Sequence, residues 1–361
     1  MPEAADQKKR RPKAADYFRP LRCSGVVLLE SNPDNHTALE SVDSTNAYLL
    51  REDLPAGSVV FAREQTSGRG RQGRSWLARP DASLIFSGVL EFDGSFPLER
   101  LRLLPLLTGV ALLQVCRAEL ERHAPEAAAQ QLSIKWPNDL YSVAAGGEPR
   151  KLGGILLESR VSGSGSSAIC RVVLGVGLNC CGPVPEPADA KVPAGSLYPG
   201  ALPGEGSPIT RFGRPLVAAI NRLLPEFHET RQIQTDRGPV FLEELRAASF
   251  LKDRVVRHGE NSFRVLDIAA GGELVLEELA SGRRSLLDDT SEDLQLVPCS
   301  SALQAQPSPQ AVRARSRAVF IPRSRCSRSA AGLSTAQSRR PEFCASPLAR
   351  DFASNLAIKL A

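Results

Sequence analysis

Glycine and arginine alternate in the segment EQTSGRGRQGRSW, residues 64–76. Glycine lets the backbone approach a ligand closely, and the planar guanidinium group of arginine matches the oxygen atoms of a carboxylate or a phosphate. The segment therefore predicts a loop that wraps around an anionic ligand and faces it with Arg69, Arg71 and Arg74. A solvated basic loop or an RNA-binding turn would fit these residues about as well.

The same segment satisfies the G-x-G-x-x-G pattern of dinucleotide-binding folds through Gly68, Gly70 and Gly73. That pattern requires the third glycine to open a helix, and an acidic residue about twenty positions later. Asp93 lies at that distance, but the intervening residues 75–92 contain a proline, a turn and a predicted strand. We therefore reject a dinucleotide-binding fold.

Three further motifs place polar side chains at strand ends. In IKWPNDLY, residues 134–141, the proline ends a strand, so that Lys135 and Asp139 flank one turn. Alone, this motif would also fit a structural turn with a solvated lysine. KLGGILLES puts Lys151 at the start of a strand whose glycines leave room for a ligand, and GVGLN repeats that arrangement before Asn179. The Asn179 amide can recognise a purine edge.

The elements that must position these residues are mostly strands between residues 26 and 180, at 26–30, 58–64, 84–92, 133–137, 151–160 and 169–179. Helical spacing of apolar residues predicts helices at 97–123, 210–231 and 240–249, and Ser44-Thr45-Asn46 precedes a short capped helix. Residues 181–208, rich in proline and glycine, predict a surface loop. Short strands with tight turns between 252 and 298 predict a small β-barrel.

Charge separates the ends of the chain from its centre. Residues 299–361 hold nine arginines and one lysine against two acids, a charge of +8 in a chain of net charge +5, which leaves −3 elsewhere. We therefore expect a disordered basic leader at 1–25, a larger folded domain at 26–251, the barrel at 252–298 and a disordered Arg/Ser/Ala-rich tail at 299–361. The tail is a poor guide to what the folded part binds.

The cysteines and the apolar runs predict the redox state of the thiols and the compartment of the protein. The eight cysteines form no CxxC pair, so we expect reduced thiols, with Cys180 and Cys181 buried at a strand end. We expect no apolar run long enough to span a membrane. The leader's KKRRPK cluster lacks the apolar core of a secretory signal, so we expect a cytoplasmic protein, with plastid or mitochondrial import as the alternative.

Taken together, Ser44-Thr45-Asn46, GRGRQGR, KWPND, KLGGIL and GVGLN resemble, in order and approximate spacing, the motifs of biotin–protein ligases, also called holocarboxylase synthetases. The resemblance implies an α+β fold: a catalytic domain like that of class II tRNA synthetases, with a mixed sheet backed by helices, followed by an SH3-like β-barrel. Only about 25 residues precede the first predicted strand, so we expect no N-terminal DNA-binding domain.

The resemblance also implies roles for site residues. Ser44, Thr45 and Gln65 would hydrogen-bond the ureido ring of biotin, the loop would close over biotin and phosphate, and Lys151 would lie near the acyl-phosphate. Mg²⁺ would be carried mostly by phosphates and water rather than by the protein. The implied catalytic residues are Lys151, Arg71, Lys135 and Asp139. The implied biotin contacts are Ser44, Thr45, Asn46, Gln65, Arg69, Gly70, Arg71, Lys151 and Gly154, and the implied ATP contacts are Arg71, Arg74, Trp76, Lys135, Asn138 and Asn179.

The implied activity is a two-step ligation. Biotin and ATP would form biotinyl-5′-AMP, and the biotinyl group would pass to a lysine of the biotin carboxyl carrier domain of acetyl-CoA carboxylase or a related carboxylase. We expect Asp139 to orient or deprotonate that amine, or else to serve the turn. We expect no specific DNA and no membrane partner. The alternatives are a lipoate or octanoate protein ligase of the same superfamily and a non-catalytic biotin- or RNA-binding protein.

Overall fold

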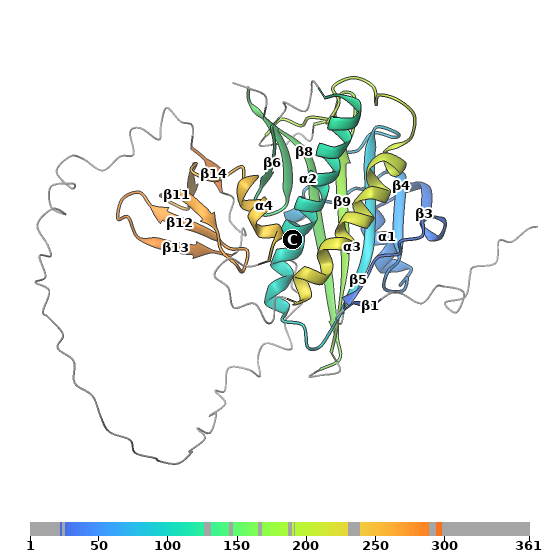
Figure 1. Cartoon of the computed structure of the whole chain (residues 1–361), viewed down its shortest axis with the longest axis horizontal. Coiled ribbons are helices and arrows are strands. Elements are labelled where there is room, and N and C mark those ends of the chain that lie inside the picture. Colours follow the sequence, from blue (N-terminus) through green and yellow to red (C-terminus); the bar gives the residue numbers. More distant parts are fainter. Residues whose placement is uncertain are drawn as a thin grey trace, which may run out of the picture.

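The computed structural model describes residues 22–23, 26–125, 131–143, 147–164, 168–186, 190, 192–229, 239–288 and 294–297. These residues form a nine-stranded mixed sheet with helices on it and a five-stranded antiparallel sheet (Figure 1). The predicted tail and most of the predicted leader lie outside the described residues. Within the predicted leader, β1 (Arg22–Cys23) pairs with β2 (Val26–Val27).

The large sheet has the order β1-β2-β5-β9-β8-β7-β6, and β4 joins it by pairing with both β5 and β3. Only β3 and β4 are parallel, so the sheet is mixed, as predicted. The sequence patterns did not predict β3. The remaining strands of this sheet are β3 (Thr37–Val42), β4 (Val59–Gln65), β5 (Ser83–Asp93), β6 (Gln131–Lys135), β7 (Asp139–Val143), β8 (Pro149–Ser162) and β9 (Ile169–Asn179).

Alternation of side chains along the central strands gives the sheet two different faces. In β5, Phe86 and Leu90 belong to the main core, whereas Ser87 and Val89 point to the opposite face. That main core contains α2 (Leu103–His123), α3 (Arg214–Glu229) and α4 (Phe241–Ala247), and α2 and α3 lie side by side across the sheet in Figure 1. The short helix α1 (Thr45–Arg51) packs on the opposite face.

The long predicted helix begins differently from its pattern. Leu98–Arg102 forms a 3₁₀ turn, and the α-helix starts at Leu103, with Pro105 in its first turn where no intrahelical N–H bond is lost.

The 26 residues from Leu98 to His123 do have the length and mean hydropathy of a membrane span, contrary to our expectation. However, 78% of that apolar window is buried inside the fold, which is the pattern of a core helix.

The five-stranded sheet has the order β13-β12-β11-β10-β14, with every pair antiparallel. Among the described residues its outer strands do not pair with each other, so the closed barrel predicted here is not seen. The sheet docks on the larger one because Trp136 Nε1 donates to Gly272 O at 2.8 Å and Arg102 pairs with Glu273 at 2.8 Å. Its strands are β10 (Val255–His258), β11 (Asn261–Ile268), β12 (Leu274–Glu278), β13 (Arg284–Leu287) and β14 (Gln295–Leu296).

Part of the predicted surface loop after β9 is buried, at Ser196, Leu197 and Tyr198. Leu197 N donates to Asn179 O and Gly195 N donates to Lys151 O, so the segment runs alongside the ends of β9 and β8. Cys180 is fully buried, as predicted, but Cys181 lies beyond the strand end and is partly exposed. The prediction that both thiols are buried is therefore wrong for Cys181.

Candidate active site

A cavity of about 440 Å³ opens on the sheet face opposite α2. Three of its walls are the start of α1, the glycine- and arginine-rich loop and the turn between β6 and β7. The start of β8, the end of β9 and the strand β14 complete the cavity. All fifteen residues predicted for the site lie on its wall, although they come from segments spread over more than a hundred positions: Ser44, Thr45, Asn46, Gln65, Arg69, Gly70, Arg71, Arg74, Trp76, Lys135, Asn138, Asp139, Lys151, Gly154 and Asn179.

Two glycines of β9 let other elements lie directly on the sheet. A Cβ atom on Gly175 would come within 2.4 Å of Asn46 Oδ1, and one on Gly177 would come within 2.3 Å of the Trp76 ring. Any larger side chain would lift α1 or the indole off the strand. The glycines of GVGLN therefore form the floor of the cavity.

The glycine- and arginine-rich loop, residues 68–76, is held in shape by its own backbone. Trp76 N donates to Gly68 O at 2.9 Å and Gly70 N donates to Arg74 O at 2.7 Å. Gly73 has a φ of 74°, a left-handed conformation that glycine adopts without strain. Arg74 is extended, so no helix starts after Gly73, in agreement with our rejection of a dinucleotide-binding fold.

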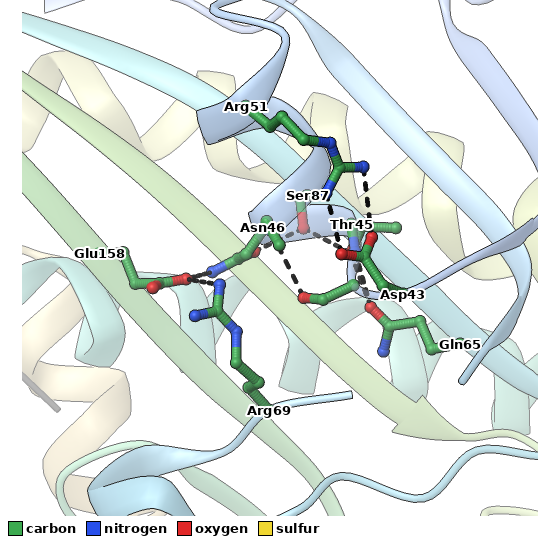
Figure 2. Close-up of polar contacts among 10 residues, drawn as sticks. Asp43, Thr45, Asn46, Arg51, Gln65, Arg69, Ser87 and Glu158 are labelled. Atoms are coloured by element: carbon green, nitrogen blue, oxygen red, sulfur yellow. Dashed lines mark hydrogen bonds and ion pairs between the residues drawn. The ribbon is translucent and has the colours of Figure 1, made fainter. Parts of the chain in front are cut away.

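A buried polar network lies beside the floor, at the start of α1 (Figure 2). Thr45 donates to Gln65 Oε1 from its backbone N at 2.8 Å and from its hydroxyl at 3.1 Å. Ser87 Oγ lies 2.7 Å from Thr45 Oγ1. Ser44 accepts from Ala47 N as the helix cap, which leaves its hydroxyl proton available to a ligand.

Asn46 extends this network toward the loop. Its Oδ1 accepts from Ser87 Oγ at 2.6 Å, and its Nδ2 donates to Glu158 Oε2 at 2.9 Å. The same carboxylate oxygen accepts from an Arg69 NH2 group at 3.1 Å. Sequence analysis missed Ser87 and Glu158; the signal for Ser87 was a lone hydroxyl within the apolar run LIFSGVLEF.

Three cations of the motifs contact residues of β7 and the turn before it. Lys151 Nζ lies 2.7 Å from Asp139 Oδ1, in an ion pair whose angles are not those of a directed hydrogen bond. Arg71 donates to Asn138 Oδ1 at 3.4 Å, and Lys135 lies over the Tyr141 ring, 5.8 Å from its centre. The arrangement concentrates positive charge where the loop meets the turn.

Tyr141 adds a neutral hydroxyl beside this charge. Burial, helped by the negative charge of Asp139, raises the pKa of Tyr141 well above its usual value. The phenol therefore carries no negative charge in the neutral range, and it does not repel an anionic ligand bound by Lys135 or Lys151.

Two buried polar atoms of cavity-wall residues have neither a hydrogen-bond nor an ion-pair partner among the described residues. Asn179 is almost fully buried; its Nδ2 donates to Gly195 O at 3.1 Å, but its Oδ1 accepts nothing. Trp76 Nε1 is likewise buried and donates to nothing. Because buried polar groups are normally paired, an acceptor and a donor left open on one cavity indicate a polar ligand.

The described residues contain no group of three His, Cys, Asp or Glu side chains that could hold a metal ion. Asp139 is the carboxylate on the described cavity wall, and it is paired with Lys151. A divalent cation in this cavity would therefore take most of its oxygen ligands from the substrate and water.

Comparisons with known proteins agree with the motifs. Residues 38–179 match the family model described as "Biotin/lipoate A/B protein ligase family". A protein named biotin–[acetyl-CoA-carboxylase] ligase from Paracoccus denitrificans is 38% identical over 167 residues, which cover 46% of this chain and 59% of that protein. A Mycobacterium tuberculosis protein of the same name is 40% identical over 141 residues, 38% of this chain and 46% of that protein. The chain therefore spans less than two thirds of the curated relatives it matches.

A crystal structure of biotin protein ligase from Aquifex aeolicus aligns with 73% of this chain and 99% of that chain, with a TM-score of 0.51 and 19% sequence identity. This similarity shows a shared fold and confirms the mixed sheet backed by helices. The matched family model covers every motif from the start of α1 to the end of β9. The resemblance inferred from those motifs thus agrees with the comparison: residues 38–179 match the model of the biotin/lipoate A/B protein ligase family.

Proposed function

We propose that this protein is a biotin–protein ligase, which joins biotin to ATP as biotinyl-5′-AMP and then transfers the biotinyl group to a lysine of a biotin carboxyl carrier domain. The observation that carries the proposal is the single cavity that brings together a polar network, a cluster of cations and two unpaired polar atoms. Each of the three suits a different part of the reactants.

The polar network fits the ureido ring of biotin. That ring offers two N–H donors and one carbonyl acceptor, and the network offers acceptor oxygens on Gln65 and Asn46 together with the hydroxyl of Ser44. This feature favours biotin over lipoate or octanoate, because a dithiolane ring or an alkyl chain would leave the buried Ser44 hydroxyl proton without an acceptor. An unpaired buried polar group costs about 1–3 kcal/mol.

The cations fit the first reaction step. A carboxylate oxygen of biotin attacks the α-phosphorus of ATP, and pyrophosphate leaves with the electrons of the broken P–O bond. The two reactants are both anionic, so Lys151, Arg71 and Lys135 would offset their repulsion. One preorganised donor of this kind typically stabilises a transition state by about 3 kcal/mol. Mg²⁺, held mainly by the phosphate oxygens, would add to the same effect.

The unpaired atoms fit the base of ATP. Asn179 Oδ1 can accept from the exocyclic amino group of adenine, whereas guanine presents a carbonyl oxygen at that position and would be repelled. The Trp76 ring lies directly against Gly177, where it can form one wall of a nucleotide pocket. We therefore place ATP toward Asn179 and biotin toward α1.

Asp139 is best placed to act through Lys151. In the second step the amine of the carrier lysine attacks the acyl carbon, AMP leaves, and the amine loses a proton. An incoming amine would share the Asp139 carboxylate with Lys151, whose Nζ lies 2.7 Å from Oδ1. An Asp139→Asn variant that transfers biotin from preformed adenylate at the normal rate would limit Asp139 to the first step.

The five-stranded sheet completes the cavity in this proposal. Gln295 and Leu296 of β14 lie on the wall, and Trp136 links the turn of the site to the sheet. We propose that it is an SH3-like module whose docking encloses the nucleotide. Its antiparallel order and short strands support that assignment.

The experiment that tests the proposal is ATP-dependent transfer of labelled biotin to a purified biotin carboxyl carrier domain. We expect transfer by the wild type, a loss of about a hundredfold in Lys151→Ala, and no loss in Lys252→Ala, an exposed lysine outside the cavity. Arg71→Gly should form adenylate and release it early. Lipoate and a lipoyl domain, offered in parallel, should give no product. Absence of both transfer and biotin-dependent pyrophosphate release in the wild type would refute the proposal.

A further inference from the structure

Glu158 lies on β8, on the sheet face that carries the cavity, and it is not one of the residues implied by the motifs. One of its oxygens, Oε2, accepts from Asn46 Nδ2 at 2.9 Å and from Arg69 NH2 at 3.1 Å. Figure 2 shows the Asn46 amide, from α1, and the Arg69 guanidinium, from the glycine- and arginine-rich loop, both reaching the Glu158 carboxylate. A single atom thus joins two parts of the site.

On the side of α1, the carboxylate fixes which way the Asn46 amide faces. A carboxylate only accepts hydrogen bonds, so it must be met by the NH₂ group, and the carbonyl oxygen is then turned to Ser87. Gly175 leaves room for that oxygen directly on β9. Without the negative charge, either end of the amide could face Glu158's position, and the acceptors of the network would lose their fixed arrangement.

On the side of the loop, the carboxylate fixes where the loop lies over the sheet, whereas the loop's own backbone hydrogen bonds fix its shape. The backbone bonds between Gly68 and Trp76 and between Gly70 and Arg74 close the loop on itself, but they do not attach it to the sheet. Trp76 on Gly177 attaches one end of the loop to β9, and Arg69 on Glu158 attaches the other end to β8. Arg69 therefore differs from Arg71, which reaches the turn at Asn138.

We propose that Glu158 is a positioning residue that holds the loop over the cavity through Arg69 and, through Asn46, ties the closed loop to the ring-binding network. The inference rests on the proposed function for its consequence, which is retention of the acyl-adenylate. Loss of the carboxylate would leave the cations that favour adenylate formation in place but would let the loop lift. Adenylate would then form and escape.

The test uses Glu158→Gln, which keeps the shape of the side chain and one acceptor oxygen but removes the charge. Arg69→Met removes the other partner, and Glu260→Gln, at an exposed glutamate in the turn between β10 and β11, is the matched control. The first measurement needs no substrate: trypsin cleavage of the native full chain after Arg71 and Arg74, followed by mass spectrometry. We expect cleavage to be about tenfold faster in Glu158→Gln and in Arg69→Met, and unchanged in Glu260→Gln.

The second measurement separates positioning from folding. At saturating biotin, so that a weakened ring-binding network does not limit the first step, the fraction of labelled biotinyl-adenylate that is released should rise about tenfold in Glu158→Gln. The double variant Glu158→Gln/Arg69→Met should leak no faster than either single variant, because both remove one contact. Multiplied effects in the double variant, or unchanged cleavage and leakage in Glu158→Gln, would overturn the inference. A wild type that protects its loop but forms no adenylate would refute the proposed function alone.

Discussion

Replacing Trp136 by phenylalanine should weaken the connection between the two sheets. The change removes one donor while keeping an aromatic ring in a position where only 3% of the side chain is exposed. The lost contact is the 2.8 Å hydrogen bond from Trp136 Nε1 to Gly272 O, which is buried. Because Pro137, Asn138 and Asp139 follow directly and line the cavity, the loss should also reach the site.

The size of the effect follows from the burial of both partners. Removing one partner of a buried hydrogen bond leaves the other unsatisfied and costs about 1–3 kcal/mol. The smaller ring adds a packing loss of about 1 kcal/mol. We therefore expect the free energy of unfolding to fall by about 2–4 kcal/mol, which is a large part of the 5–15 kcal/mol typical of a domain.

The chain has two tryptophans, and the second one supplies the control. Trp76 Nε1 has no hydrogen-bond partner among the described residues, so Trp76→Phe removes an unsatisfied donor and should change stability by less than about 1 kcal/mol. Urea unfolding followed by circular dichroism measures both variants without relying on tryptophan fluorescence. Equal losses in the two variants, or an unchanged Trp136→Phe, would refute the role of the hydrogen bond.

Two further predictions concern the floor of the cavity and the thiols. Gly177→Ala should lower ATP affinity by at least tenfold, measured by calorimetry, because its Cβ would lie 2.3 Å from the Trp76 ring; biotin affinity should change little. Burial raises the pKa of Cys116 and Cys180 well above the ordinary thiol value, so mildly alkaline iodoacetamide should label Cys181 and spare both. Because the unfolded chain releases these protons first, stability should fall as pH rises above about 9, and a flat alkaline stability profile would contradict this.

The central strands could be predicted because their residues are apolar over long runs. The run ICRVVLGVGLN is β9 in full, and KLGGILLESR lies inside β8. The strand Thr37–Val42 could not be predicted, because its pattern HTALESV mixes polar and apolar residues at the edge of the sheet. Such a strand is specified by its pairing with β4 rather than by its own composition.

The residues of the candidate site could be named from motifs, but their contacts could not. Nothing in the sequence shows that Lys151 pairs with Asp139, because the register of β7 and β8, with its irregularity beside Leu140, sets that distance. Ser87 and Glu158 stand in strands that otherwise read as core, and only the alternation of faces on a folded sheet brings them to Asn46. Side-chain partners across a sheet depend on register, which local patterns do not contain.

The pairing of β5 with β9 has a consequence for the time course of folding. Those strands are joined along eleven residue pairs, from Ser83 with Asn179 to Asp93 with Ile169, although more than seventy positions separate them along the chain. Such non-local pairing requires closure of a long loop, so it slows folding. During synthesis, the two central strands cannot meet until β9 has emerged, and a chain stopped before Gly175 has no cavity floor. During refolding, the ability to bind ligand in the cavity should therefore appear together with the final, slow phase of sheet formation.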